Sequence, residues 1–233
     1  MATRRGFLAG TSLWLAGAAF ARAEDLCAVS TKATQSATSA EQALTHLKEG
    51  NERFLSGKSI HCNLMSQVKA TAQGQAPFAA ILGCMDSRVP PELVFDQRIG
   101  DIFSVRVAGN IVNTDILGSL EYATQVAGTK LIVVLGHSDC GAIKGAVDEV
   151  KLGNLTQMLA NIQPSVLKVA GGVGDHTSKN KKFVQGVADQ NARDSAANLT
   201  ARSEVLAALV KNHQLKIVSA MHDVGTGAVR WLT

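Results

Sequence analysis

Short runs of consecutive apolar residues alternate along this chain with segments whose apolar residues recur every three or four positions. The uninterrupted runs at 78–83 and 131–135 are typical of strands buried on both faces of a sheet, and the mostly apolar run at 102–107 between them is a further strand candidate. Segment 115–127 lies between the second and third runs and has helical spacing, with one face formed by Ile116, Leu117, Leu120 and Ala123. A strand–helix–strand order predicts a parallel sheet with crossover helices.

The remaining pattern is mainly helical. Ser39 followed by Gln42 resembles a capping box and predicts a helix that begins there and ends at Gly57. Segment 141–150 is expected to be helical, and so is most of 152–211, apart from a break at the glycines of 171–174.

The chain closes with two apolar segments, 215–220 and 228–232, which flank a glycine-rich turn and predict a hairpin. We therefore expect one α/β domain over residues 40–233. Its central, mostly parallel sheet is flanked by helices, with a helical arm before it and the hairpin at its end.

The first 23 residues have the pattern of a targeting segment. Arg4 and Arg5 precede an apolar stretch at 8–20, and Ala21-Arg-Ala23 is typical of a cleavage site. The paired arginines resemble a twin-arginine signal, so we expect cleavage after Ala23 and a periplasmic protein. The apolar stretch is shorter than the roughly 20 residues that span a bilayer, which argues against a stable membrane anchor. Residues 24–39 are rich in Ser, Thr and Ala and are expected to form a linker or arm.

Charge and cysteine content narrow the function classes. The whole chain has a formal net charge of +4, and removal of the three arginines of the signal leaves +1. No basic patch interleaved with aromatic residues is found, so nucleic acid is not an expected partner. Of the four cysteines, Cys27 and Cys62 could pair in an oxidising compartment or remain free thiols; their spacing does not decide between these.

Two short segments carry the residues with the clearest chemistry. Cys84, Asp86 and Arg88 follow the first apolar run, while His137 and Cys140 follow the third. Neighbouring parallel strands bring their carboxyl ends together, so these side chains can converge. Two thiolates, an imidazole and a carboxylate form a tetrahedral shell that favours zinc over hard cations. The arginine can hold the carboxylate off the metal, which would give zinc the open position that catalysis requires.

Other interpretations of these residues explain less. A structural zinc site usually has four Cys or His ligands, whereas the fourth candidate here is a carboxylate beside an arginine. Gly136–Gly141 begins like a phosphate-binding loop but lacks the Lys-Ser or Lys-Thr that should follow. A cysteine nucleophile paired with histidine would leave the second Cys, the Asp and the Arg without a role.

At these residues the chain resembles a β-class carbonic anhydrase. The resemblance covers most of the predicted domain and rests on Cys84-Met-Asp-Ser-Arg-Val-Pro-Pro-Glu92, Phe103-Ser-Val-Arg-Val-Ala-Gly-Asn110 and Gly136-His-Ser-Asp-Cys-Gly141. It implies a homo-oligomer, a dimer or a multiple of dimers, that interconverts carbon dioxide and bicarbonate. It also implies one zinc per subunit on Cys84, His137 and Cys140, with Asp86 as an exchangeable fourth ligand. The zinc-bound hydroxide would act together with a catalytic Asp86–Arg88 dyad.

The resemblance extends to the substrate pocket. Gln75 matches a residue that donates a hydrogen bond to substrate, and Gly141 falls where backbone approaches the metal. Phe103 and Tyr122 match pocket-lining aromatics that in this family can come from the partner subunit. Some bacterial members have a second, inhibitory bicarbonate site built from Trp, Arg and Tyr. Here Arg106 matches the Arg, but Ile81 and His222 occupy the other two positions, so regulation through that site is not expected.

Two alternatives share the zinc ligands and stay open from the sequence. One is a hydrolase of carbonyl sulfide or carbon disulfide on the same fold. The other is a non-catalytic zinc-binding protein whose Asp86 stays on the metal and keeps the site closed.

Overall fold

The computed structural model of the 233-residue chain describes residues 27–171 and 174–232. The predicted signal peptide and its cleavage site therefore lie outside the described residues. Among the residues that the structure does describe, no helix is both long enough and apolar enough to cross a bilayer.

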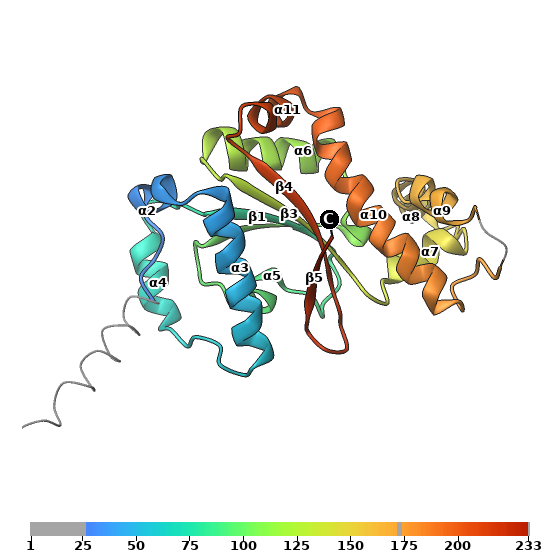
Figure 1. Cartoon of the computed structure of the whole chain (residues 1–233), viewed down its shortest axis with the longest axis horizontal. Helices are drawn as coiled ribbons and strands as arrows, with labels where there is room; N and C mark the ends of the chain where they lie inside the picture. Colours follow the sequence, from blue (N-terminus) through green and yellow to red (C-terminus); the bar gives the residue numbers. More distant parts are fainter. Residues whose placement is uncertain (1–26, 172–173, 233) are drawn as a thin grey trace, which may run out of the picture.

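A five-stranded sheet forms the centre of the molecule (Figure 1). Its spatial order is β2-β1-β3-β4-β5; the first four strands run parallel and β5 is antiparallel to β4. This confirms the predicted parallel sheet and terminal hairpin. The strands are β1 (Ala79–Gly83), β2 (Ile102–Arg106), β3 (Leu131–His137), β4 (Lys216–His222) and β5 (Val229–Leu232).

Helices connect and cover these strands. They are α2 (Lys32–Ala37), α3 (Ala40–Leu55), α4 (Leu64–Thr71), α5 (Pro91–Val94), α6 (Thr114–Glu121), α7 (Gly141–Val147), α8 (Gly153–Ala160), α9 (Gln163–Val169), α10 (Lys181–Arg202) and α11 (Glu204–Lys211), with a 3-10 turn η1 (Ala108–Asn110) and a π-helical segment η2 (Tyr122–Val126).

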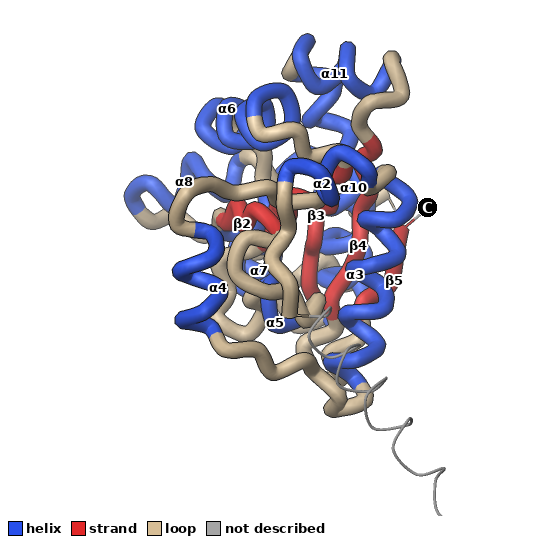
Figure 2. The backbone as a smooth tube through the Cα atoms, turned by 90° about the vertical axis from the view of Figure 1, so that its left-hand side faces the viewer, coloured by secondary structure: helices blue, strands red, loops and turns tan. Residues whose placement is uncertain are grey.

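Side-chain alternation along the buried strands gives the sheet two apolar faces. Ile81 and Val133 belong to the face that packs against α3 and α5, whereas Leu82 and Val134 belong to the face that packs against α6, α10 and α11. Figures 1 and 2 show these helices on opposite sides of the strands. The result is three layers: helix, sheet and helix.

A further apolar cluster lies beyond the carboxyl ends of the strands. Helices α7, α8 and α9 pack there against the first half of α10, through residues such as Ile143, Ile162 and Val187 (Figure 1). Cys84 and Cys140 belong to this same cluster. The candidate metal ligands therefore lie between the sheet and this group of helices.

Several predicted boundaries differ from the observed ones. The helix expected over 115–127 ends as α6 at Glu121 and continues as the π-helical η2, which stops before Gly128. The helix expected over 141–150 ends at Val147. Strand β3 continues to His137, because its backbone remains paired with β4 up to His222. The pattern did not predict the four-residue helix α5.

The arm before the domain is more structured than its composition indicated. Helix α2 lies within the predicted linker and begins with a capping box in which Thr31 and Thr34 satisfy each other's backbone N–H groups. This local pairing explains why a segment without apolar periodicity is helical. Cys27 forms a disulfide with Cys62, which resolves the open question about these two cysteines.

Hydrogen bonds hold the arm against the amino ends of β1 and β3. Ser30 Oγ donates to the carbonyl of Ala76 at 2.6 Å, and the buried Gln35 donates through Nε2 to the carbonyl of Pro77 at 2.6 Å. Lys130 Nζ donates to the carbonyl of Ser36 at 2.6 Å. The arm is thus bound to the amino-terminal edge of the sheet, whereas the candidate metal ligands lie at the carboxyl-terminal edge.

Candidate metal centre and active site

Three side chains from separate elements meet at the carboxyl edge of the sheet. Cys84 follows the last residue of β1, His137 ends the neighbouring strand β3, and Cys140 is the N-cap residue of α7. One ligand atom of each lies within 4.8 Å of the others, and all three residues are buried. The convergence expected from parallel strands is therefore observed for these residues.

The imidazole of His137 is oriented for metal binding. Its Nδ1 atom lies 2.9 Å from the carbonyl of Ser138, an interaction that places the proton on Nδ1 and leaves the lone pair on Nε2. The Nε2 atom is buried and has no hydrogen-bond partner among the described residues. Because a buried polar atom without a partner is costly, this lone pair fits a metal ion between the two sulfurs.

The two thiols lie in contact with each other, and this contact shifts their pKa values in opposite directions. Their Sγ atoms are 4.0 Å apart, and Cys84 Sγ also accepts the backbone N–H groups of Gly109 at 3.3 Å and Asp86 at 3.5 Å. The hydrogen bond from Cys140 is the main cause that lowers the pKa of Cys84. The same contact, followed by burial, raises the pKa of Cys140. A cation would stabilise both thiolates, and two thiolates with one imidazole are the donor set that zinc prefers.

Asp86 lies beside this cluster and is held by Arg88. Arg88 donates through Nε to Asp86 Oδ1 at 3.0 Å and through Nη2 to Oδ2 at 2.8 Å, a bidentate pair. These hydrogen bonds keep the pKa of Asp86 below its usual range. Asp86 Oδ2 is still only 3.9 Å from His137 Nε2, so the carboxylate borders the position that a metal would occupy. The geometry is that of a fourth ligand directed away from the centre.

Arg106 and Gly109 shape the loop that carries Cys84. The sequence did not predict this role for either residue. Arg106 on β2 donates through Nε to the carbonyl of Cys84 at 2.9 Å and through Nη2 to that of Asp86 at 2.5 Å. Gly109 has a left-handed φ of 69°, and its own carbonyl accepts Asn191 Nδ2 at 2.8 Å. The only sequence signal was the glycine beside a strand end, which is typical of close backbone approach.

The other expected pocket residues do not all reach the cluster within one chain. Gly141 begins α7 next to Cys140 and is exposed to solvent. Gln75 lies in the exposed loop before β1, and Phe103 is near the start of β2 with its ring centroid 6.3 Å from that of Tyr122. These three therefore lie toward the amino ends of the strands, at the edge away from the chain's own cluster.

The three residues at the positions of the inhibitory bicarbonate site, Ile81, Arg106 and His222, are buried or make other contacts in this structure. Arg106 donates to the backbone carbonyls described above, and Ile81 is fully buried in the core. His222 is buried opposite His137 in the β3–β4 register, and burial is the main cause that lowers its pKa.

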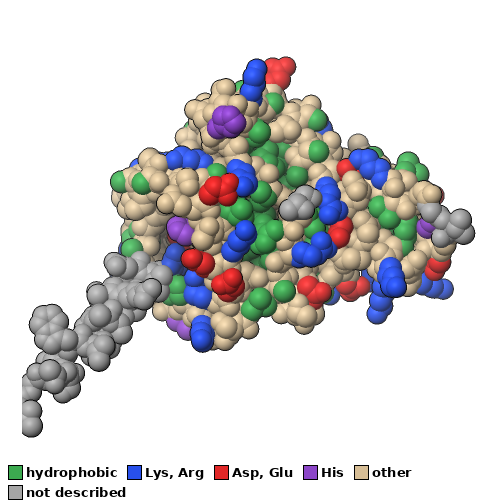
Figure 3. All heavy atoms as spheres, in the orientation of Figure 1, with side chains coloured by type: hydrophobic (Ala, Val, Ile, Leu, Met, Phe, Trp, Pro, Cys, Tyr) green, Lys and Arg blue, Asp and Glu red, His purple; other side chains and the backbone are tan. Residues whose placement is uncertain are grey.

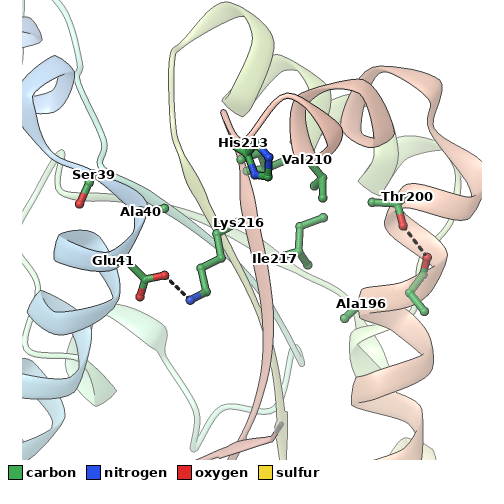
Figure 4. Close-up of a pocket in the computed structure, with 11 residues that line it drawn as sticks. Ser39, Ala40, Glu41, Ala196, Thr200, Val210, His213, Lys216 and Ile217 are labelled. Atoms are coloured by element: carbon green, nitrogen blue, oxygen red, sulfur yellow. Dashed lines mark hydrogen bonds and ion pairs between the residues drawn. The ribbon is translucent and has the colours of Figure 1, made fainter.

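A cavity of about 710 Å³ is distinct from this centre. It lies between α3 and the helices α10 and α11, over the start of β4, where hydrophobic side chains are visible in the hollow of Figure 3. Figure 4 shows Ile217 and Val210 on its apolar side and the Glu41–Lys216 ion pair across it. The cavity contains none of the candidate metal ligands, so its size alone does not make it the active site.

Comparison with known proteins agrees with this geometry. The family model described as carbonic anhydrase matches residues 79–229, which include strands β1 to β4 and the cluster. Carbonic anhydrase 2 of Mycobacterium tuberculosis is 38% identical over 78% of this chain and 87% of its own length. The carbonic anhydrase of Mycolicibacterium smegmatis is 35% identical over 78% of this chain and 88% of its own length.

Solved structures give the same result for the fold. A Coccomyxa β-carbonic anhydrase in complex with acetazolamide superposes with a TM-score of 0.65 at 26% identity, covering 81% of this chain and 86% of that chain. A structure from a study of two tetrameric β-carbonic anhydrases of Sordaria macrospora has a TM-score of 0.65 at 26% identity and covers 81% and 96%. With its Cys-His-Cys cluster and parallel sheet, the chain belongs to the β-class carbonic anhydrase family.

Proposed function

We propose that this protein interconverts carbon dioxide and bicarbonate at a zinc centre held by Cys84, His137 and Cys140, one zinc per subunit, with Asp86 and Arg88 as a catalytic dyad. The observation that carries the proposal is the unpartnered Nε2 atom of His137, which faces two thiols beside a carboxylate that Arg88 holds aside. Bound zinc would supply Lewis acidity, which lowers the pKa of a water molecule and makes it a nucleophile.

The protein's own residues supply orientation and charge. The bidentate pair with Arg88 keeps Asp86 ionised and directed away from the ligand atoms, which leaves the fourth position free for water. From there the ionised Asp86 carboxylate would accept a hydrogen bond from a water or hydroxide at that position, and so would orient a lone pair of that oxygen toward the carbon of the substrate. Arg106 and Gly109 fix the loop that carries these groups.

A permanently closed, non-catalytic site is supported less well. Closure requires the Asp86 carboxylate to leave Arg88 and bind the metal, and the described conformation has both carboxylate oxygens on the guanidinium. For a carbonyl sulfide or carbon disulfide hydrolase, no observation in the described residues favours the sulfur-containing substrate over carbon dioxide.

Stopped-flow hydration of carbon dioxide by the zinc-loaded protein tests the proposal. We expect fast hydration that acetazolamide suppresses, since a structural neighbour was solved with this compound. Arg230→Ala, which removes a surface ion pair with Asp189, is the matched control for loading and folding. Zinc-loaded protein that hydrates no carbon dioxide but hydrolyses carbonyl sulfide or carbon disulfide would reassign the substrate, and inactivity on all three would favour the closed site.

We also propose that the active form is a dimer or a multiple of dimers. Strand β2 lies at one edge of the sheet. The segments that precede and follow it in the chain carry exposed apolar side chains, among them Leu93, Ile99 and Tyr122. An unpaired edge with apolar surroundings favours pairing with a second copy. The tetrameric Sordaria proteins support the same view. Sedimentation velocity would reject it if the zinc-loaded protein stayed monomeric at assay concentrations.

For location, we propose export to the periplasm with cleavage after Ala23. The paired arginines and apolar stretch support export, and the Cys27–Cys62 disulfide supports an oxidising compartment. Amino-terminal sequencing of protein from a periplasmic extract tests this; an intact Met1 terminus in the cytosolic fraction would contradict it.

A further inference from the structure

Arg88 contacts a second carboxylate besides Asp86. Its Nη1 atom lies 3.6 Å from Asp139 Oδ2, and its Nη2 atom donates to the backbone carbonyl of Asp139 at 3.4 Å. Asp139 stands between His137 and Cys140, in the loop that carries two of the three candidate ligands. The guanidinium therefore bridges the two segments that build the centre.

The two carboxylates use different parts of the guanidinium. Asp86 takes Nε and Nη2, whereas the Asp139 carboxylate faces Nη1. Since the acceptors do not compete for one N–H group, both contacts can exist together and fix the plane of the arginine. Among the described residues, Asp139 is the carboxylate that forms an ion pair with Nη1.

Lys144 completes the arrangement. Its Nζ atom forms an ion pair with Asp139 Oδ1, which also lowers the pKa of Asp139. Two anions and two cations thus alternate from Asp86 through Arg88 and Asp139 to Lys144. The positive charge of Lys144 partly neutralises the Asp139 carboxylate and so weakens its attraction for Arg88. The guanidinium accordingly lies closer to Asp86, at 2.8 Å, than to the Asp139 carboxylate, at 3.6 Å.

The backbone at Asp139 serves the same contact. Its φ of 58° is left-handed, a conformation that L-residues other than Asn and Asp adopt rarely. In this conformation the carbonyl and the carboxylate of one residue both reach the same guanidinium.

We infer that Asp139 is a positioning residue: by holding Nη1 of Arg88 it keeps the bidentate grip on Asp86 and so keeps the fourth metal position open. This inference rests on the proposed function. It adds a residue from the ligand loop to the dyad, with Lys144 as its neutralising partner.

Cobalt-substituted protein offers a test that does not depend on turnover. The visible spectrum of cobalt changes when azide takes the fourth position, so an azide titration measures how often that position is free. Asp139→Asn is the informative variant, because Asn tolerates the left-handed φ and keeps the shape of the side chain. The contact is solvent-exposed, so we expect azide affinity to fall by about two- to fivefold.

Two comparisons separate positioning from a general structural effect. Asp189→Asn, which breaks the surface pair with Arg230, should leave azide affinity unchanged. In an Arg88→Gln background, azide should bind weakly, and adding Asp139→Asn should change nothing further. Equal azide affinity in the wild type and Asp139→Asn would overturn the inference. The inference would also fail if Asp139→Asn lowered azide affinity by the same factor in the wild-type and in the Arg88→Gln background.

The carbon dioxide assay keeps the two proposals apart. If the wild-type zinc protein hydrates carbon dioxide and Asp139→Asn leaves azide binding intact, only the positioning role fails. If the wild type hydrates no carbon dioxide but Asp139→Asn weakens azide binding through Arg88, the reaction assignment fails and the positioning role stands.

Discussion

The backbone N–H of Gly109 donates to Cys84 Sγ at 3.3 Å, so a residue with no side chain supports one of the two sulfurs proposed to bind zinc. A Cβ atom at this position would lie 2.7 Å from Ile162 Cδ1 and 3.3 Å from Ala142 Cβ. The positive φ favours glycine at this turn, and a Cβ atom would have to displace the fully buried Ile162 side chain.

Gly109→Ala is therefore expected to lower the free energy of unfolding by about 1–3 kcal/mol. It should also weaken zinc binding, because the N–H donor moves away from the sulfur. Urea denaturation and competition with a zinc chelator measure the two effects. Gly118→Ala is the control: this glycine lies in α6 with open space around its Cα, so the exchange should be neutral or stabilising. A Gly109→Ala protein with normal stability and zinc affinity would contradict the assigned role.

Arg88→Ala should abolish most activity while the protein keeps its zinc. Once the guanidinium is gone, its two hydrogen bonds no longer hold the Asp86 carboxylate, whose Oδ2 lies 3.9 Å from His137 Nε2 and so borders the position proposed for zinc. We expect hydration to fall by about 100-fold or more, the loss typical of removing an oriented active-site group. Stopped-flow assays and metal analysis measure the two quantities. An active, zinc-loaded Arg88→Ala protein would refute the dyad.

Removal of the Cys27–Cys62 disulfide should destabilise the fold without changing the metal site. The bridge closes a loop over a sequence separation of 35 residues, for which a loss of about 2–4 kcal/mol is expected. The double variant Cys27→Ser, Cys62→Ser should match the reduced wild type in urea denaturation and bind the same amount of zinc. Altered zinc stoichiometry would mean that the Cys27–Cys62 disulfide also shapes the metal centre.

The pH dependence of activity should not be set by Asp86. Arg88 keeps the pKa of Asp86 below its usual value of about 3.9, so this carboxylate stays ionised at neutral pH. Its contribution to stability is complete above that usual value and is lost only as the pH falls through the lowered one.

The alkaline limb of the profile therefore reports the nucleophilic water. Two thiolate ligands would neutralise the charge of a zinc ion held there, so water at this position should ionise above the pKa of about 7 found at three-histidine sites. We expect kcat/KM to climb from about pH 7 to about pH 9. A profile that is flat over this range in stopped-flow measurements would contradict that assignment.

Much of the metal centre was predictable from the sequence because it follows from topology. Cys84 and His137 end neighbouring parallel strands, and Cys140 lies one short turn further, so strand order alone brings them together. The contributions of Arg106 and Gly109 were not predictable, because they depend on which backbone atoms approach once β1 and β2 have paired.

Other parts lacked any periodic signal. Helix α2 is held by its capping box and by hydrogen bonds to distant carbonyls, not by an apolar face. The disulfide depends on where the arm runs, and spacing between cysteines does not reveal that path. The π-helical end of α6 adds one residue per turn, which a regular 3.6-residue period cannot show.

The separation of Gln75, Phe103 and Tyr122 from the chain's own cluster has a genetic consequence. If each subunit completes its neighbour's site, two differently defective chains can rescue each other. A chain with Cys84→Ser and a chain with Gln75→Ala should each be defective alone. A mixed dimer of the two would combine both defects in one site and leave the other site whole. Each mixed dimer should then have half the activity of a normal dimer, because one of its two sites is intact. The unit that such a mutation inactivates would therefore be the interface between two subunits and not the single polypeptide.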